Sequence, residues 1–172
     1  YNILAAVTYG AMLGIDPAAV ERGIAKYKPQ LGRMERFFLG KPVILNLAKN
    51  PVGFDESMKV VAKDPRDKTM VLGINDLPQD GTDVSRLWDT NFELLKEADV
   101  EQYVVFGRCS RDMALRLEDA GIDPSKITAF ASAEAAVEFA AKSEDPVVSM
   151  LVNYSLLFET QRLLTRRAET LS

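Results

Sequence analysis

The segment "PVILNLAKNPVGFDESMKVVAKDPRDKTMVLGIN" (42–75) decides the fold class. It begins with a short apolar run at 42–47, continues through a helix-period segment at about 52–63, and ends in a second apolar run at 68–75. Short apolar runs bounded by turn signals are typical of strands buried on both faces, and a helix between two of them makes a right-handed crossover. The segment therefore predicts a β-α-β unit of a parallel sheet.

The same alternation continues along the rest of the chain and predicts an α/β fold, with a Rossmann-like, mostly parallel sheet and helices on both faces. Residues suited to helix ends support this interpretation: Gly121 is expected at a C-cap, Ser132 at an N-cap, and Asp89 at the N-cap of the segment that follows it. The remaining strands are expected at 101–107, 126–130 and 146–153, and the remaining helices at about 89–98, 110–120, 132–142 and 154–168.

Two short helices are expected ahead of this alternation. Residues 2–14 carry apolar side chains with small residues between them. In the stretch "DPAAVERGIAKY" (16–27), Asp16 is expected as the N-cap and Pro17 at the first helical position. The chain opens inside an apolar helical pattern, so we expect it to be a fragment of a longer protein.

A polar stretch punctuated by glycine and proline, "KPQLGRMERFFLGKP" (28–42), separates these helices from the alternating region. Such a composition predicts a linker or hinge that leads into an edge strand. We therefore place a boundary near Leu31, with residues 1–31 as a helical tail plus hinge and residues 32–172 as the α/β domain.

The composition excludes several classes of function. A chain of 172 residues with 47% hydrophobic residues suits one packed domain, and a net charge of -4 argues against nucleic acid as a partner. The absence of histidine means that Ser-His-Asp or Cys-His catalysis cannot be completed within this chain. The single cysteine, Cys109, excludes an internal disulfide and a multi-cysteine zinc site, suits a reducing cytoplasm, and is expected to be an inert thiol. No metal site, leader or transmembrane segment is expected.

Two loops that follow predicted strands are rich in polar groups, "NLAKNPVGFDE" (46–56) and "NDLPQDGTDVSRLWD" (75–89). In a parallel sheet ligands bind beyond the carboxyl ends of the strands, so these loops are the candidate site. The first loop is also explained by a capped turn, with Asn50 as N-cap and Pro51 at the first helical position. In the second loop, a solvated turn is the alternative explanation for Asp83, and a helix N-cap is the one for Asp89.

Three motifs resemble the Mur ligase superfamily. The opening "YNILAAVTYGAMLGIDPAAVERGI" (1–24) resembles the helix and turn that end the central ATPase domain, and "GRMERF" (32–37) resembles the Gly-Arg-x-Glu hinge into the C-terminal domain. The stretch "NLAKNPVG" (46–53) sits where typical members have Asp-Tyr-Ala-His-Asn-Pro. Here Asn46 replaces the aspartate that usually holds the nucleotide ribose, and Lys49 replaces the histidine.

With these two changes, the sequence resembles the MurT subgroup. The C-terminal domain of that subgroup carries an Asn-Asp…Asp-Gly-x-Asp-Val-Ser-x-x-Trp-Asp signature, which residues 75–89 match. The stretch "GRCSRDMALRLEDAG" (107–121) matches that subgroup in outline. The resemblance covers essentially the whole chain. One departure is Arg86, where the subgroup commonly has tryptophan or another large apolar residue.

The resemblance implies a function. MurT proteins work with a GatD-type glutamine amidotransferase to amidate the α-carboxyl of the second-position glutamate of lipid II, a peptidoglycan precursor. ATP activates the carboxyl as an acyl phosphate, and ammonia released from glutamine displaces the phosphate. ATP and Mg are then bound mainly by an N-terminal portion outside this chain, so the chain alone is expected to be inactive. The implied location is cytoplasmic, at the inner face of the membrane.

The resemblance implies that the partner supplies a cysteine and a histidine, and that the MurT subunit supplies the acid that orients the histidine. We select Asp83 as this acid, because it follows the turn at Gly81 and precedes the apolar Val84, a position from which a loop carboxylate can project outward. Asp76, directly at the end of the predicted strand, is the alternative. An Asx-turn or a solvated carboxylate explains Asp83 equally simply. The resemblance also implies nucleotide or substrate contacts by four residues: Asn46, Lys49, Asn50 and Arg33.

Four other residues have two interpretations each. Glu35, with its neighbour Arg33, serves ligand binding at the hinge or forms a surface ion pair. Trp88 is an anchor in the core or in an interface, and Tyr154 and Ser155 line the cleft or cap a helix. Two alternative functions stay open for the whole chain: an ordinary Mur ligase or folylpolyglutamate-synthase-like domain, and a non-catalytic α/β interaction module.

Overall fold

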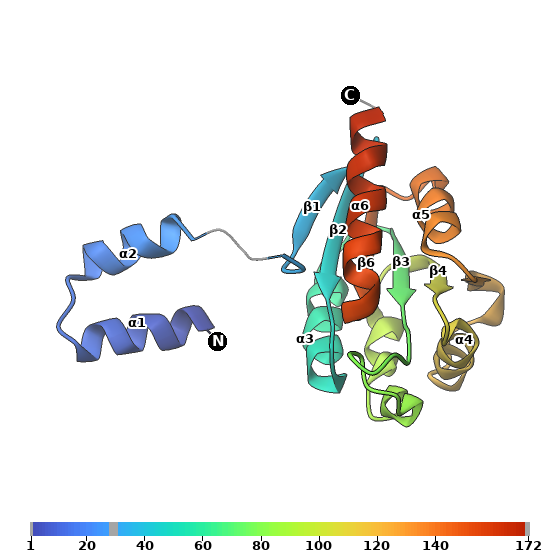
Figure 1. Cartoon of the computed structure of the whole chain (residues 1–172), viewed down its shortest axis with the longest axis horizontal. Coiled ribbons are helices and arrows are strands. Elements are labelled where there is room, and N and C mark those ends of the chain that lie inside the picture. Colours follow the sequence, from blue (N-terminus) through green and yellow to red (C-terminus); the bar gives the residue numbers. More distant parts are fainter. Residues whose placement is uncertain (1, 28–30, 171–172) are drawn as a thin grey trace. The chain divides into compact units, whose positions relative to one another are not determined.

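The computed structural model describes residues 2–27 and 31–170. Its internal contacts divide the chain into two compact units, Tyr1–Gln30 and Leu31–Ser172. The first unit contains two helices, and the second contains a six-stranded sheet covered by helices (Figure 1).

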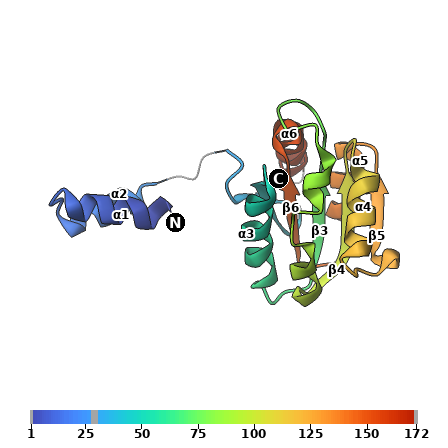
Figure 2. The same ribbon diagram turned by 90° about the horizontal axis from the view of Figure 1, so that it is seen from below.

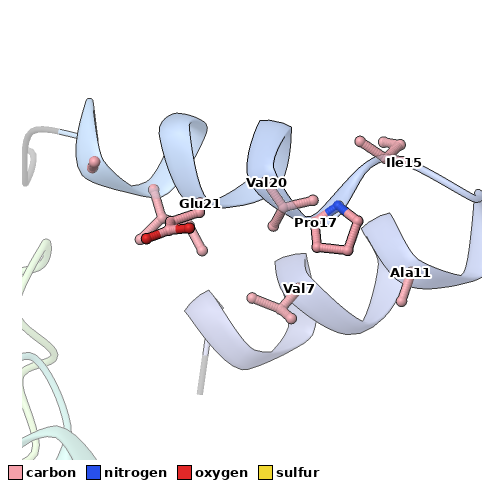
Figure 3. A pocket seen from close by; sticks show the side chains of 8 residues that line it. Val7, Ala11, Ile15, Pro17, Val20 and Glu21 are labelled. Carbon is pink, nitrogen blue, oxygen red and sulfur yellow. The ribbon is translucent and has the colours of Figure 1, made fainter.

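The first unit is a pair of helices, α1 (Asn2–Met12) and α2 (Pro17–Ala25). As predicted, Asp16 is the N-cap of α2, where its carboxylate accepts a hydrogen bond from the Ala18 N–H at 3.3 Å. Gly10 is buried, and a Cβ there would lie 3.0 Å from Val20, so the glycine lets the two helices pack closely. An open hollow of about 410 Å³ lies between the helices (Figure 3), and its lining includes none of the candidate site residues.

The second unit is built on a sheet with the strand order β1-β2-β6-β3-β4-β5. The strands from β2 to β5 in this order are all parallel, whereas β1 is an antiparallel edge strand. Every residue of β3 and β6 is buried, as expected for strands covered on both faces. The bounds are β1 (Glu35–Phe38), β2 (Pro42–Leu47), β3 (Lys68–Gly73), β4 (Val100–Phe106), β5 (Ile127–Phe130) and β6 (Val147–Val152).

Helical segments cover both faces of the sheet (Figure 2). One hydrophobic core contains buried residues of α3, η1, η2 and α4, and the other contains buried residues of α5 and α6. The predicted three-layer α/β architecture is therefore confirmed. The bounds are α3 (Pro51–Ala62), η1 (Val84–Leu87), η2 (Phe92–Glu97), α4 (Ser110–Asp119), η3 (Pro124–Lys126), α5 (Ala133–Lys142) and α6 (Tyr154–Thr170), where η denotes a 3-10 helix.

The stretch 28–42, expected to lead into an edge strand, contains that strand itself. Residues 28–30 lie outside the described residues, but β1 follows within the stretch and pairs with β2 from Glu35 opposite Leu45 to Phe38 opposite Pro42. The strand predicted at 42–47 is thus the second strand of the sheet, covered along one side by β1.

The prediction of an α-helix at 89–98 with Asp89 as its N-cap is wrong. The segment forms the 3-10 helix η2, which begins after Asn91. Phe92 and Leu95 are both buried, and a repeat of three residues places both on the same side of the segment. The Asn91 N–H donates to Asp55 of α3 at 2.9 Å, which fixes the start of η2.

No helix of the described ranges combines the length and the apolar character that crossing a membrane would need.

Candidate functional site

The strand order places the candidate site around the carboxyl end of β6. This strand lies between β2 and β3. The helix α6 that follows β6 packs in one hydrophobic core, whereas α3, after β2, and η1, after β3, pack in the core on the opposite face. Neighbouring strands whose connections leave toward opposite faces create a crevice at their carboxyl ends, where ligands of open α/β sheets bind.

The turn after β2 carries a helix cap. The side chain of Asn50 accepts a hydrogen bond from the Gly53 N–H at 2.8 Å, and Pro51 is the first residue of α3. The capped turn predicted from the sequence is confirmed. A contact of Asn50 with a nucleotide stays a prediction.

Asn46 connects three parts of the second unit. Its Nδ2 donates to the Ser57 hydroxyl of α3 at 2.7 Å, and its Oδ1 accepts from the Met34 N–H at 3.2 Å. The Leu47 N–H next to it donates to the carbonyl of Gly32 at 2.8 Å. Both ends of the Asn46 amide are therefore bonded within the unit, and these bonds bring the exposed Arg33 to the carboxyl end of β2.

Lys49 extends this group toward β6. Its side chain is exposed, and its ammonium lies 5.9 Å from the centre of the Tyr154 ring, a cation–π contact with the first residue of α6. The ring of Tyr154 packs edge-on against Phe158 at a centroid distance of 6.0 Å. The structure thus brings together Lys49 and Tyr154, which lie about a hundred residues apart in the sequence.

Asn75, a residue that the sequence reasoning did not select, joins three strand ends. Its Oδ1 accepts from the Arg108 N–H after β4 at 2.9 Å, and its Nδ2 donates to the Ser155 hydroxyl after β6 at 2.9 Å. Its own carbonyl accepts from Asn153 Nδ2 at 2.7 Å and from Arg86 Nη2 at 3.2 Å. The signal in the sequence was an asparagine directly after an apolar strand, where a backbone-like side chain can satisfy neighbouring polar groups.

Asp80 is a second residue of this network that the sequence reasoning did not select. It is only 5% exposed, and its Oδ1 accepts from the Ser155 N–H in the first turn of α6 at 2.9 Å. The positive end of the helix dipole stabilises a carboxylate in this position. The sequence held no signal that separates this buried aspartate from the other three of the loop.

Asp83 lies in the same loop but is exposed. It is the N-cap of η1, where its Oδ1 accepts from the Ser85 N–H at 2.9 Å. Hydrogen bonds from Ser85 hold the pKa of Asp83 below its ordinary value. The Asx-type contact considered from the sequence is therefore present, and it leaves an ionised carboxylate at the surface.

Asp76, the alternative acid, is tied to the next loop. Its Oδ1 lies 2.6 Å from Nε of Arg108 in an ion pair, and this hydrogen bond lowers the pKa of Asp76. The two candidate acids thus share one loop, but Asp76 already has a cationic partner on this chain.

The remaining candidates have structural partners. Trp88 is about half exposed and donates from Nε1 to Asp119 of α4 at 3.1 Å. Cys109 is buried, and this burial raises its thiol pKa, as expected for an inert cysteine. Glu35 accepts from the Gly32 N–H and from Gln161 Nε2, so its contacts differ from the surface ion pair with Arg33 that the sequence suggested.

Within residues 2–27 and 31–170, no cluster of three or more His, Cys, Asp or Glu side chains is arranged to hold a metal ion. Lys49 and Arg33 are exposed cationic side chains at the β2 end, and their contact with the phosphates of a nucleotide stays a prediction.

Curated proteins of two organisms are similar to the chain. It is 30% identical over 168 residues to the "Lipid II isoglutaminyl synthase (glutamine-hydrolyzing) subunit MurT" of Streptococcus pneumoniae (strain ATCC BAA-255 / R6). This match covers 97% of the chain and 38% of the relative. It is 35% identical over 124 residues to the protein of the same name in Staphylococcus aureus (strain COL), which covers 72% of the chain and 28% of the relative. The chain thus spans less than half the length of these relatives.

Solved structures share the fold. The structure of MurF from Acinetobacter baumannii aligns with 98% of this chain, over 37% of the MurF chain, with a TM-score of 0.68 at 22% identity. Folylpolyglutamate synthase from Mycobacterium tuberculosis matches 90% of the chain and 37% of its own, with a TM-score of 0.62 at 21% identity.

The model of one family, described as MurT ligase C-terminal, matches residues 47–157, which include the second candidate loop, the first loop from Leu47 onward, and the strands β3 to β6. The chain therefore belongs to the MurT ligase C-terminal family.

Proposed function

We propose that this chain is the C-terminal part of the ATP-dependent subunit of an enzyme that amidates lipid II. With a GatD-type glutamine amidotransferase, this subunit converts the α-carboxyl of the lipid II glutamate to isoglutamine at the inner, cytoplasmic face of the membrane. The family match carries the proposal, and the names of the relatives in two organisms support it, because both name a glutamine-hydrolysing synthase of this product.

The chemistry requires two activated species. A phosphoryl group passes from ATP to the glutamate carboxylate, and ammonia released from glutamine attacks the acyl phosphate, with phosphate as the leaving group. The residues of this chain serve both steps from the carboxyl edge of the sheet. The side that faces the nucleotide is formed at the β2 end by Lys49, Arg33, Asn46 and Asn50. The side that faces the amidotransferase is formed by the loop after β3.

We assign Asp83 the role of the acid that orients the partner's histidine. A carboxylate bonded to an imidazole fixes its tautomer and stabilises the imidazolium that forms during proton transfer. Two observations on this chain support Asp83 over Asp76: the Asp83 carboxylate is exposed, and the Asp76 carboxylate is already paired with Arg108. Because this chain contains no histidine, an acid of this chain can orient only an imidazole that is supplied from outside it.

The test is the glutaminase activity of the full-length protein in complex with its amidotransferase. Asp83→Asn keeps the size and removes the charge, and we expect kcat to fall by about 10²-fold or more while the complex still assembles. Asp123→Asn is a matched control, since Asp123 caps η3, also accepts from the N–H two residues on at 2.9 Å, and precedes β5 at the opposite edge of the sheet.

Full activity of Asp83→Asn together with a large loss in Asp76→Asn would move the triad acid to Asp76. Full activity of both variants would contradict a catalytic role of this loop and favour a non-catalytic interaction surface. A comparable loss in Asp123→Asn would show that the effect is one of folding.

A further inference from the structure

The guanidinium of Arg86, one departure from the signature in the resemblance to the MurT subgroup, donates hydrogen bonds to three backbone carbonyls. Its Nη1 donates to the carbonyls of Asp80 and Gly81, the latter at 2.7 Å, and its Nη2 donates to the carbonyl of Asn75 at 3.2 Å. All three acceptors are backbone oxygens of the loop that follows β3. Within the described part of the chain, none of its hydrogen-bond partners is a carboxylate.

The backbone of the loop makes few hydrogen bonds to itself. Its own backbone bonds are a turn contact from the Asp80 N–H to Leu77 at 2.8 Å and a long one from the Gly81 N–H to Pro78 at 3.4 Å. Gly81 has a φ of 89°, and a Cβ at this position would lie 2.5 Å from Nη1 of Arg86. The glycine therefore provides both the left-handed backbone and the space through which the guanidinium reaches its carbonyls.

The contacts of Arg86 with the carbonyls of Asn75, Asp80 and Gly81, here called the clamp, lie on both sides of the proposed triad acid in the sequence. Asp83 lies between Gly81, which accepts from the guanidinium, and Arg86, which supplies it. Asp83 also caps η1, the 3-10 helix that contains Arg86. Arg86 is thus linked to both backbone segments that flank the Asp83 carboxylate.

We propose that Arg86 is a positioning residue that holds the loop 75–81 through three carbonyls and thereby directs Asp83 toward the histidine of the amidotransferase. This inference rests on the function proposed above. A guanidinium suits the role because its planar fork presents several donors in fixed directions, whereas an ammonium is a point charge. Small errors in the placement of a catalytic group cost large factors in rate, so a residue that acts only through the loop has a measurable effect.

The experiment uses the full-length protein in complex with its amidotransferase and measures kcat and KM for glutamine. We expect Arg86→Gln to lower kcat by about 10-fold or more with KM changed less than about 2-fold, because only a step that needs the placed acid is affected. Arg86→Lys keeps the charge without the fork, and we expect it to recover little of the lost rate. In an Asp83→Asn background, Arg86→Gln should cause no further loss. Arg66→Gln is the matched control, since that guanidinium is bound to Asp64 at the opposite edge of the sheet.

Hydrogen exchange of the same complexes tests the clamp without reference to catalysis. Peptides that cover residues 75–83 should exchange faster in Arg86→Gln than in the wild type or in Arg66→Gln. Unchanged exchange would overturn the clamp. Wild-type kcat in Arg86→Gln, full rescue by lysine, or an equal further loss in the Asp83→Asn background would overturn its action through Asp83. If Asp83→Asn alone kept full activity, the proposed role of Asp83 would fall, and exchange would still decide whether Arg86 holds the loop.

Discussion

At the scale of single residues, the candidate site separates polar groups that hold the strand ends from those that face solvent. Asn75 and Asp80 are buried and bonded to groups of other loops, whereas Asp83 and Lys49 are exposed. A buried polar group without partners costs free energy, and Asn75 and Asp80 supply partners to neighbouring polar groups. These two residues therefore stabilise the fold, whereas Asp83 and Lys49 are available to ligands and partners.

Lys49 gives the first prediction at this scale. Its ammonium is exposed beside Tyr154 at the β2 end, so we expect Lys49→Ala to weaken ATP binding by the full-length protein about 10-fold through the loss of one charge-assisted phosphate contact. Isothermal titration with a non-hydrolysable ATP analogue measures this. Lys142→Ala, on α5 and paired with Glu138, is the control, and equal affinities in the two variants would contradict a nucleotide contact.

Asp64 gives a prediction for the pH dependence of stability. Its side chain is 23% exposed, and the hydrogen bond from Arg66 lowers its pKa from 3.8 to about 2. Because the pKa is lowered in the folded state, the stabilisation is fully present above about pH 4 and is lost as the pH falls toward 2. Arg66 is about half exposed, so solvent screening reduces the effect to about 1 kcal/mol.

The measurement is the free energy of unfolding of the wild type and Asp64→Asn between pH 2 and pH 7. The difference between them should be constant at neutral pH and vanish near pH 2. A difference that grows on acidification would contradict the assignment.

At the scale of elements, the connection from β3 to β4 is the least regular part of the sheet unit, since it has two 3-10 helices in place of an α-helix. Arg116 of α4 holds it. This side chain is buried and donates to the carbonyls of Leu87 and Thr90 and to the Glu93 carboxylate. The guanidinium thus takes up carbonyls that the short 3-10 turns leave without helical partners.

We therefore expect Arg116→Met to lower the free energy of unfolding by about 3 kcal/mol, because it leaves buried carbonyls unpaired. Glu93→Gln, which keeps a hydrogen-bond acceptor at a half-exposed position, should cost less than about 1 kcal/mol. Urea unfolding of the two variants measures both values. Similar losses would show that the ion pair, and not the carbonyl contacts, is what Arg116 contributes.

At the scale of the whole molecule, both hydrophobic cores belong to the second unit. All of their described members lie at residue 37 or beyond. The helix pair α1–α2 instead carries mostly exposed apolar side chains, among them Leu4, Tyr9 and Met12. A domain of the size of the second unit buries enough surface to fold by itself, whereas a 30-residue helix pair does not.

We predict that a chain of residues 31–172 folds independently and unfolds within about 3 °C of the full 172-residue chain, since no core residue is lost. Thermal unfolding followed by circular dichroism measures the midpoint. A fall of more than about 8 °C would show that the helix pair stabilises the sheet unit.

Local sequence patterns specify most of the secondary-structure elements and part of the chemistry of the site. Its periodicity predicted the strands and most helices, and its caps, at Asp16, Asn50 and Ser132, are present as expected. These features are local, because a cap or an apolar period is set by residues within a few positions of one another. The failed helix at 89–98 is the exception, since its packing against α3 and the buried side chains determine its form.

The contacts among polar residues of the site, in contrast, depend on the strand order. The strand order inserts β6, the last strand of the sequence, between β2 and β3, and so brings Ser155 to Asn75 and Asp80 and brings Tyr154 to Lys49. Strand order depends on how two hydrophobic faces are covered by helices distant in sequence, a long-range balance of burial that no local pattern encodes. The buried network that supports the Asp83 loop is therefore a property of the fold, whereas the carboxylates themselves are properties of the sequence.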